Sequence, residues 1–103
     1  MLEIKRRLGQ SFIIDRRITV WVDSYAATSI RRVTLGVDRP GSPRRSLIIP
    51  IGESAHIQTL AGCVTIHARW IARGEVALGI EAPLSIDIQR PDRIIRGRNE
   101  ATS

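Results

Sequence analysis

The chain contains one short pattern twice at a fixed separation, and this repeat limits the fold more than any other feature. "VTLGVDRP" covers residues 33–40 and "VALGIEAP" covers 76–83, so a glycine and a proline each recur 43 positions later. In both copies apolar residues alternate with small or polar ones up to a proline, which is typical of a strand that ends in a turn. The chain has 103 residues, so neither half could bury a sufficient core alone. We therefore expect two small, similar units that share one core.

Other segments repeat in the same order and alternate apolar with polar side chains, as half-buried strands do. Residues 2–7 ("LEIKRR") lead to a turn at Gly9, whose counterpart is Gly52, again 43 positions later. Residues 17–22 ("RITVWV") match 63–70 ("CVTIHARW"), at a separation that has drifted to 46. About nine short strands with turn residues between them predict an all-β fold of two packed antiparallel sheets.

The remaining segments differ between the two copies. Residues 24–29 ("SYAATS") are an insertion that we expect to form a loop. Residues 84–95 ("LSIDIQRPDRII") predict a fifth strand in the second copy, with Ile86, Ile88 and Arg90 on one face. The matching place in the first copy holds "GSPRRS", whose glycine and proline disfavour a strand.

The chain therefore divides into two repeats and a tail. Residues 1–43 form the first repeat, with a degenerate fifth strand, and residues 44–97 form the second. A short C-terminal helix, or none, is expected after Pro91. Residues 98–103 are expected to be a flexible tail. Two such units fused in one chain correspond to a dimer whose two copies have become one molecule.

The charge of the chain indicates a polyanionic partner or a generally basic surface. The formal net charge is +6, and 15 of the 16 basic residues are arginine, with Lys5 as the only lysine. The planar fork of arginine suits phosphates and base edges. Aromatic residues make up only 4% of the chain, which leaves little ring surface for stacking many bases. Charge alone does not decide between nucleic acid and a solvated surface.

Several classes of protein are disfavoured by what the chain contains. A single cysteine, Cys63, forms no intrachain disulfide, and the charged start of the chain does not match a signal peptide. No stretch is long and apolar enough to span a membrane, so we expect a cytoplasmic protein. One cysteine with His56 and His67 gives no zinc-site spacing. No phosphate-binding loop or nucleophile elbow is present, so we expect neither an enzyme nor a cofactor or metal.

Two segments taken together resemble one known family. The start "MLEIKRRLGQSFII" has Met-Leu, alternating apolar residues, Arg-Arg, a small aliphatic residue, glycine, then Gln and a hydroxyl residue. The later "RGEVALGIEAPLSIDIQR" has a turn, Val-x-Leu-Gly-Ile-x-Ala-Pro, and a strand that ends in arginine. In this order and spacing they resemble the carbon storage regulators, the CsrA/RsmA family of bacterial translational repressors. The resemblance covers almost the whole chain, as two copies of a unit that family members contain once.

The resemblance implies both the fold and the place of an RNA site. Family members are interlocked homodimers, in which each RNA site combines the first strand of one subunit with the fifth strand of the other. The implied fold here is two intertwined five-stranded units in one chain, a monomeric pseudo-dimer. The implied RNA-binding residues are Ile4, Lys5, Arg6, Arg7, Ala82, Pro83, Ile88, Gln89 and Arg90.

The implied residues differ from the family at one position in this site and at more positions in its counterpart. Gln89 stands where the family commonly has a histidine. In the second composite site, Ile49 and Pro50 occupy the places of the two arginines of the first strand. Arginines 44 and 45 could restore some charge there, but their register is ambiguous.

The implied residues suit the reading of GGA in single-stranded or hairpin-loop RNA. Arg90 can offer its fork to guanine O6 and N7, and the three basic residues of the first strand can hold phosphates. The two isoleucines of the set would pack against base faces. Each also has a purely structural interpretation. The charges would keep an edge strand solvated, Arg90 would form a salt bridge to Asp92 or cap the strand end, and the isoleucines would pack in the core.

The resemblance implies an RNA-binding post-transcriptional regulator. Such a protein binds GGA in mRNA 5′ leaders or small RNAs and controls translation and mRNA stability. A protein antagonist is a further implied partner, because in flagellated bacteria a flagellar assembly factor antagonises family members. Two alternatives stay open: a protein-interaction module with weakened RNA binding that titrates a partner, and a basic β-class DNA-binding module. The sequence also leaves open whether two chains associate.

Overall fold

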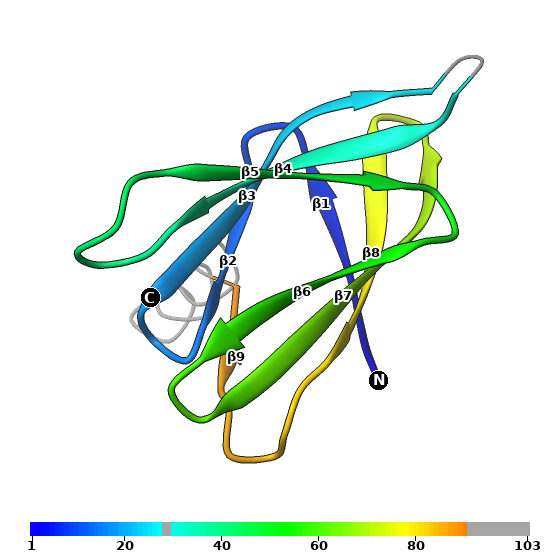
Figure 1. Cartoon of the computed structure of the whole chain (residues 1–103). Helices are drawn as coiled ribbons and strands as arrows, with labels where there is room; N and C mark the ends of the chain where they lie inside the picture. Colours follow the sequence, from blue (N-terminus) through cyan, green and yellow to red (C-terminus); the bar gives the residue numbers. More distant parts are fainter. Residues whose placement is uncertain (28–29, 91–103) are drawn as a thin grey trace, which may run out of the picture.

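The computed structural model describes residues 1–27 and 30–90, and this part of the chain is all-β (Figure 1). It contains no helix that could span a membrane. The predicted C-terminal helix and flexible tail lie outside the described residues. The strands are β1 (Leu2–Arg7), β2 (Ser11–Ile14), β3 (Ile18–Ala26), β4 (Arg32–Asp38), β5 (Arg45–Pro50), β6 (Ser54–Thr59), β7 (Gly62–Ala72), β8 (Glu75–Glu81) and β9 (Ile88–Gln89).

The strands form two antiparallel sheets, which confirms the predicted all-β, two-sheet fold. One sheet has four strands in the order β1-β8-β7-β6, and the other has five in the order β5-β4-β3-β2-β9. The core lies between them, because every second residue of most strands is buried, as the pleat of a strand requires. The largest fully buried side chains are Phe12, Ile4, Ile14, Leu35, Ile49, Ile66, Leu78 and Ile80.

Each half of the chain contributes its first strand to the sheet built by the other half. β1 pairs with β8, whereas β5, the first strand of the second half, pairs with β4. The last strand, β9, also crosses over and pairs with β2. Each three-stranded meander, β2–β4 in one sheet and β6–β8 in the other, is therefore extended by strands from the other half of the chain. The shared core predicted from the length of the chain follows directly from this exchange.

The two halves repeat the same backbone hydrogen bonds at their first turns. The Gly9 N–H donates to the Val22 carbonyl (2.8 Å), and the Gly52 N–H donates to the Ala68 carbonyl (2.8 Å). Both glycines have positive φ, +82° and +94°, a region that side chains other than glycine rarely adopt. The strand register shifts directly after Val22 in β3 and after Ala68 in β7. The two halves that repeat in sequence therefore also share the same turn hydrogen bond and the same β-bulge.

The glycine in the middle of each repeated strand makes room for a neighbouring side chain. Gly36 lies opposite Trp21, and a Cβ at Gly36 would lie 2.2 Å from the Cζ2 atom of the Trp21 ring, which is a steric clash. A Cβ at Gly79 would lie 2.5 Å from the Met1 sulfur and 3.2 Å from Arg69 Cδ. At both strand glycines a neighbouring side chain approaches the backbone closely. This close approach explains why both copies of the strand have glycine at the same position.

Two expectations about element lengths are wrong. Residues 24–26 are not a loop, because β3 continues to Ala26 and pairs with Arg32–Thr34 of β4. Pairing satisfies backbone groups that a loop beside the sheet would leave exposed. The predicted fifth strand over 84–95 is only Ile88–Gln89 within the described residues. The chain has to cross from one sheet to the other after β8, and residues 82–87 make that crossing.

The first half lacks a fifth strand, as its glycine and proline predict. Between β4 and β5 the chain makes a turn in which the Ser42 N–H donates to the Arg39 carbonyl (3.2 Å), and Gly41 has φ +77°. No strand of the described residues covers the outer edge of β6. The four-stranded sheet is therefore one strand short of its counterpart.

Candidate nucleic-acid interface

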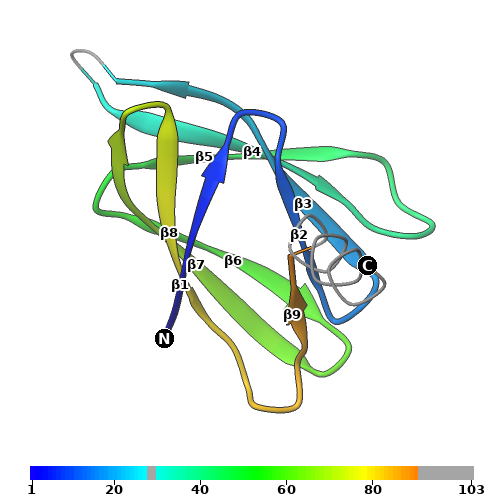
Figure 2. The same cartoon turned by 180° about the vertical axis from the view of Figure 1, so that it is seen from behind.

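Two edge strands from opposite ends of the chain border the same groove. β1 is an edge of the four-stranded sheet, and β9 is an edge of the five-stranded sheet. Figure 2 shows both strands on one face of the molecule. The groove has a volume of about 380 Å³ and is lined by Met1, Leu2, Ile80, Glu81, Ala82, Pro83, Leu84, Ile86 and Ile88. The structure therefore brings together the first strand of one half and the last strand of the other.

The side chains of β1 divide between the interior and the surface. Ile4 and Arg6 are buried, whereas Lys5 and Arg7 are exposed, as the alternation of a strand requires. Ile4 is 1% exposed and belongs to the core. Its structural interpretation as a packing residue therefore describes it better than contact with a base face.

Arg6 crosses between the two sheets rather than pointing into solvent. It is 7% exposed, its Nη1 donates to the Ser11 carbonyl of β2 (3.2 Å), and its Nε donates to the Lys5 carbonyl (2.7 Å). A guanidinium this deeply buried needs such acceptors to offset the loss of water. Arg6 is thus placed to hold β1 against β2, and not as a solvated charge at the edge.

Lys5 and Arg7 carry positive charge on the outer face of β1. The Lys5 ammonium lies 5.4 Å from the centre of the Trp70 ring, within the range of a cation–π contact. The Arg7 side chain is 59% exposed, and its Nη2 is 3.9 Å from Glu75 Oε2. An exposed pair at this distance contributes little, so Arg7 is open to an outside anion.

The backbone of β1 also faces outward at alternate residues. The N–H of Arg7 donates to Gln10 Oε1 (2.9 Å), and the Lys5 carbonyl accepts from Arg6, so these groups point away from β8. The backbone groups of Glu3 point the same way, because bonding direction alternates along an antiparallel ladder. The edge therefore presents backbone donors and acceptors beside two positive side chains.

On the other side of the groove, β9 holds Ile88 and Gln89 against β2. Gln89 pairs with Ile13, and its Nε2 donates to Asp87 Oδ2 (2.8 Å). Ile88 is half-buried and lines the groove. Arg90 follows directly and is half-buried. Continuing the register of β9 sets Arg90 opposite Phe12, one residue from the Ser11 carbonyl that Arg6 contacts.

The connection between β8 and β9 supplies an apolar rim of the groove, and only some of its residues were predicted from the sequence. Ala82 and Pro83, both predicted, line the groove, and the Pro83 carbonyl accepts from the Ile86 N–H (2.9 Å). Exposed Leu2 and Leu84, which were not predicted, line it too. Leu2 could have been predicted as a groove residue from its place at the start of the matched first strand. Nothing in the sequence except the neighbouring residues pointed to Leu84.

The second composite place lacks the corresponding groups. Ile49 and Pro50 pair with β4 at the positions that Arg6 and Arg7 hold on β8. Ile49 is 1% exposed and buried in the core. Residues 39–44, which would supply the fifth strand, contain none. In the part of the chain that the structure describes, one composite place therefore has both of its edge strands and the other has one.

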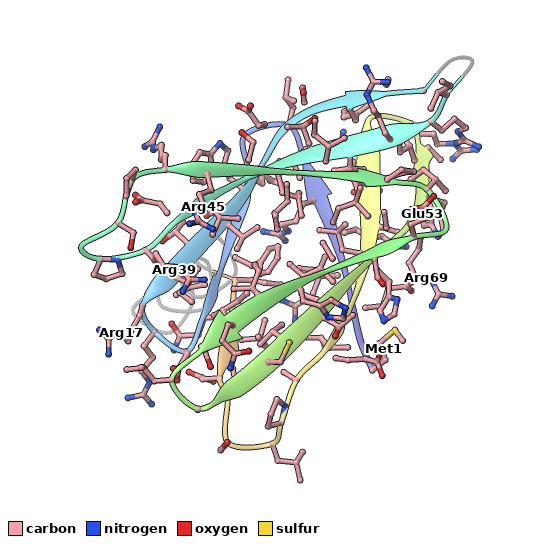
Figure 3. All side chains as sticks on the ribbon, viewed as in Figure 1. Met1, Arg17, Arg39, Arg45, Glu53 and Arg69 are labelled. Atoms are coloured by element: carbon pink, nitrogen blue, oxygen red, sulfur yellow. The ribbon has the colours of Figure 1, made fainter. Side chains whose placement is uncertain are left out.

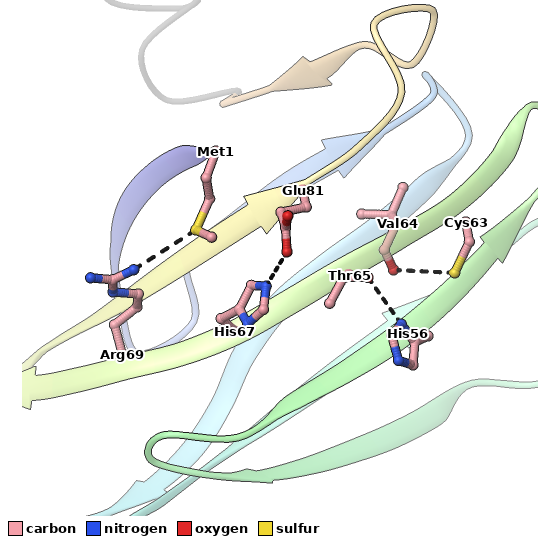
Figure 4. Close-up of polar contacts among 8 residues, drawn as sticks. All are labelled: Met1, His56, Cys63, Val64, Thr65, His67, Arg69 and Glu81. Carbon is pink, nitrogen blue, oxygen red and sulfur yellow. Dashed lines mark hydrogen bonds and ion pairs between the residues drawn. The ribbon is translucent and has the colours of Figure 1, made fainter.

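Other polar contacts lie on the outer face of the four-stranded sheet (Figure 4). His67 Nε2 contacts Glu81 Oε1 (2.5 Å), and His56 Nδ1 contacts Thr65 Oγ1 (3.0 Å). Over the described ranges, no three His, Cys, Asp or Glu side chains gather as metal ligands would.

No protein-family model, no curated protein and no solved structure was found to match this chain. Membership of the carbon storage regulator family stays a prediction.

Proposed function

We propose that this chain binds GGA-containing single-stranded or hairpin-loop RNA and regulates translation and mRNA stability by doing so. The observation that supports this most is the meeting of β1 from the first half with β9 from the second half around one groove. In the family that these two segments resemble, RNA binds where the first strand of one subunit meets the fifth strand of the other. Here one chain supplies both strands.

The groups around the groove match the chemistry of unpaired purines. Unpaired bases expose their Watson–Crick and Hoogsteen edges, which offer both donors and acceptors. The outward backbone groups of Glu3 and Lys5 are complementary to such edges, and Arg90 supplies a fork for guanine O6 and N7. Lys5 and Arg7 hold phosphates in this scheme.

The apolar part of the groove takes the faces of the bases. Leu2, Leu84 and Ile88 line it, and its volume of about 380 Å³ lies within the range of small-ligand sites. Ala82 and Pro83 shape the turn that carries Leu84. Of the nine residues that the resemblance implies, Ile4 and Arg6 act from inside, by fixing β1.

A matched pair of hairpins tests the proposal. A fluorescein-labelled RNA hairpin with GGA in its loop should bind in an anisotropy titration, and the same hairpin with CCA should bind much more weakly. Added salt should weaken binding, because phosphate contacts release counterions. Equal affinity for both hairpins would reduce the chain to a nonspecific polyanion binder, and tighter binding to duplex DNA of equal length would favour the DNA-binding alternative.

A further inference from the structure

The outer edge of β6 is the place where the two halves of the molecule differ most. β2 pairs with β3 as β6 pairs with β7, so that Ser11–Ile14 correspond to Ser54–Ile57. The outer edge of β2 carries β9. Among the strands of the described residues, none occupies the outer edge of β6.

The backbone of β6 is arranged to receive a strand. The Glu53 carbonyl accepts from the Ala68 N–H (3.0 Å), and in an antiparallel ladder every second residue bonds the same neighbour. Ser54, His56 and Gln58 therefore direct their N–H and C=O groups away from β7. The Gln58 carbonyl does accept from outside the sheet, from Arg39 Nη1 (3.0 Å).

A groove follows this edge and reaches the core. Two cavities of about 340 and 350 Å³ share Arg39, Ser42 and Gln58 in their lining. The second is also lined by the buried residues Val37 and Ile57. In the other half of the molecule, the segment that leads to β9 contains Ile86, which is 6% exposed and lines the groove between β1 and β9.

The groove is positively charged. Arg17, Arg39 and Arg45 line it, and Asp15 is the one carboxylate among its lining residues. Figure 3 shows the three arginines on the same side of the molecule as the β4–β5 connection. An occupant with carboxylates beside its apolar residues is complementary to this charge, and it fits an edge that bonds backbone to backbone better than a nucleic acid does.

We propose that the β6 edge binds an extended acidic segment of a partner protein, which adds to the four-stranded sheet as an antiparallel fifth strand. The added strand bonds the outward backbone groups of Ser54 and His56 and the N–H of Gln58. Apolar residues at alternate positions face Val37 and Ile57, and carboxylates near the two ends of the segment reach the arginines at the rim of the groove. This site is separate from the groove between β1 and β9, so the molecule can hold an RNA and a protein segment on different edges.

A short labelled peptide tests this inference. The probe is fluorescein-labelled Gly-Glu-Ile-Asp-Ile-Glu-Gly, and its control replaces the three acidic residues by lysine. The acidic peptide should bind saturably in an anisotropy titration and shift the amide NMR signals of Ser54, His56 and Gln58. The lysine peptide should not bind.

Two variants assign the binding to this edge. His56→Pro removes an outward N–H without removing a β6–β7 bond, and it should weaken binding by about tenfold, the effect of one lost hydrogen bond. Arg45→Glu should weaken binding of the acidic peptide by a similar factor. The result for this variant does not depend on whether β6 tolerates a proline. Arg32→Glu, an exposed change at the other end of β4, should leave binding unchanged.

Four results would overturn the inference. They are absence of saturable binding by the parent chain, parental affinity in Arg45→Glu, displacement of the peptide by the GGA hairpin, and a chain dimer in sedimentation that His56→Pro abolishes. The third result would assign the groove to RNA, and the fourth would assign the edge to a second copy of the chain.

Discussion

At the scale of single residues, the arginines near the groove differ in burial and in the groups that they contact. Arg6 is buried and donates to the Ser11 and Lys5 carbonyls. Arg90 is half-buried beyond the end of β9. We therefore predict that Arg90 reads a base and that Arg6 positions β1.

Replacing Arg90 by alanine should weaken binding of the GGA hairpin strongly. The lost hydrogen bonds involve a charged group and carry about 1.5–3 kcal/mol, which is roughly tenfold or more in affinity. Anisotropy titrations measure the change, and circular dichroism confirms that the variant is folded. Arg32→Ala, remote from the groove on β4, is the matched control. Parental affinity in folded Arg90→Ala would show that the site is misplaced.

Replacing Arg7 by alanine should change the salt dependence more than the specificity. Its exposed guanidinium lies 3.9 Å from Glu75 and is placed to meet a phosphate. Removing one phosphate contact lowers the slope of log K against log salt by about 1 and weakens GGA and CCA hairpins alike. The slope is measured from titrations at several salt concentrations. A lost preference for GGA with an unchanged slope would instead place Arg7 at a base.

At the scale of the strand, Gly36 of β4 and Trp21 of β3 are fitted to each other. The Trp21 ring occupies the space of a Cβ at Gly36, and the Arg44 guanidinium lies 4.7 Å from the centre of that ring. A side chain at Gly36 would push the ring away and break the stack. The "LG" that both repeats share therefore serves close packing against a neighbouring side chain.

Gly36→Ala should destabilise the fold by about 1–3 kcal/mol, the usual cost of overpacking. Urea unfolding followed by circular dichroism gives the change in the free energy of unfolding. Thr34→Ala on the same strand is the control and should cost less. A variant as stable as the parent would mean that the Trp21 ring moves without loss.

The elements also show what the sequence could and could not predict. The alternation of residues 2–7 already put Ile4 and Arg6 on one face, so the burial of Arg6 could have been read from it. The short length of β9 could not be predicted from the sequence, because it depends on how many residues the chain needs to cross between the sheets after Glu81. The pairing of Ser24–Ala26 likewise depends on β4, a partner that local pattern does not reveal.

At the scale of the whole molecule, the exchange of first strands makes one folding unit of the two repeats. Trp21 reports on the five-stranded sheet and Trp70 on the four-stranded sheet. In Trp21→Phe and Trp70→Phe, the remaining tryptophan should follow the same transition as circular dichroism in that variant, since small single domains unfold as one unit. A fluorescence transition that precedes the circular dichroism transition in either variant would mean that the sheets unfold separately.

Because both composite places lie in one chain, they need not be alike. One place has β1 and β9 with Lys5, Arg7 and Arg90. The other has buried Ile49, Pro50 without an N–H, and no fifth strand within residues 1–27 and 30–90. The proposed function therefore has a numerical consequence, the number of RNA molecules that one chain binds.

Calorimetric titration with a short GGA hairpin, on protein whose mass in solution is measured alongside, gives that number directly. We predict one tightly bound RNA per monomeric chain and no comparable heat with the CCA hairpin. Two equivalent RNAs per monomeric chain would contradict the asymmetry, a stable dimer of chains would contradict the pseudo-dimer, and equal binding of the CCA hairpin would contradict the proposed function itself.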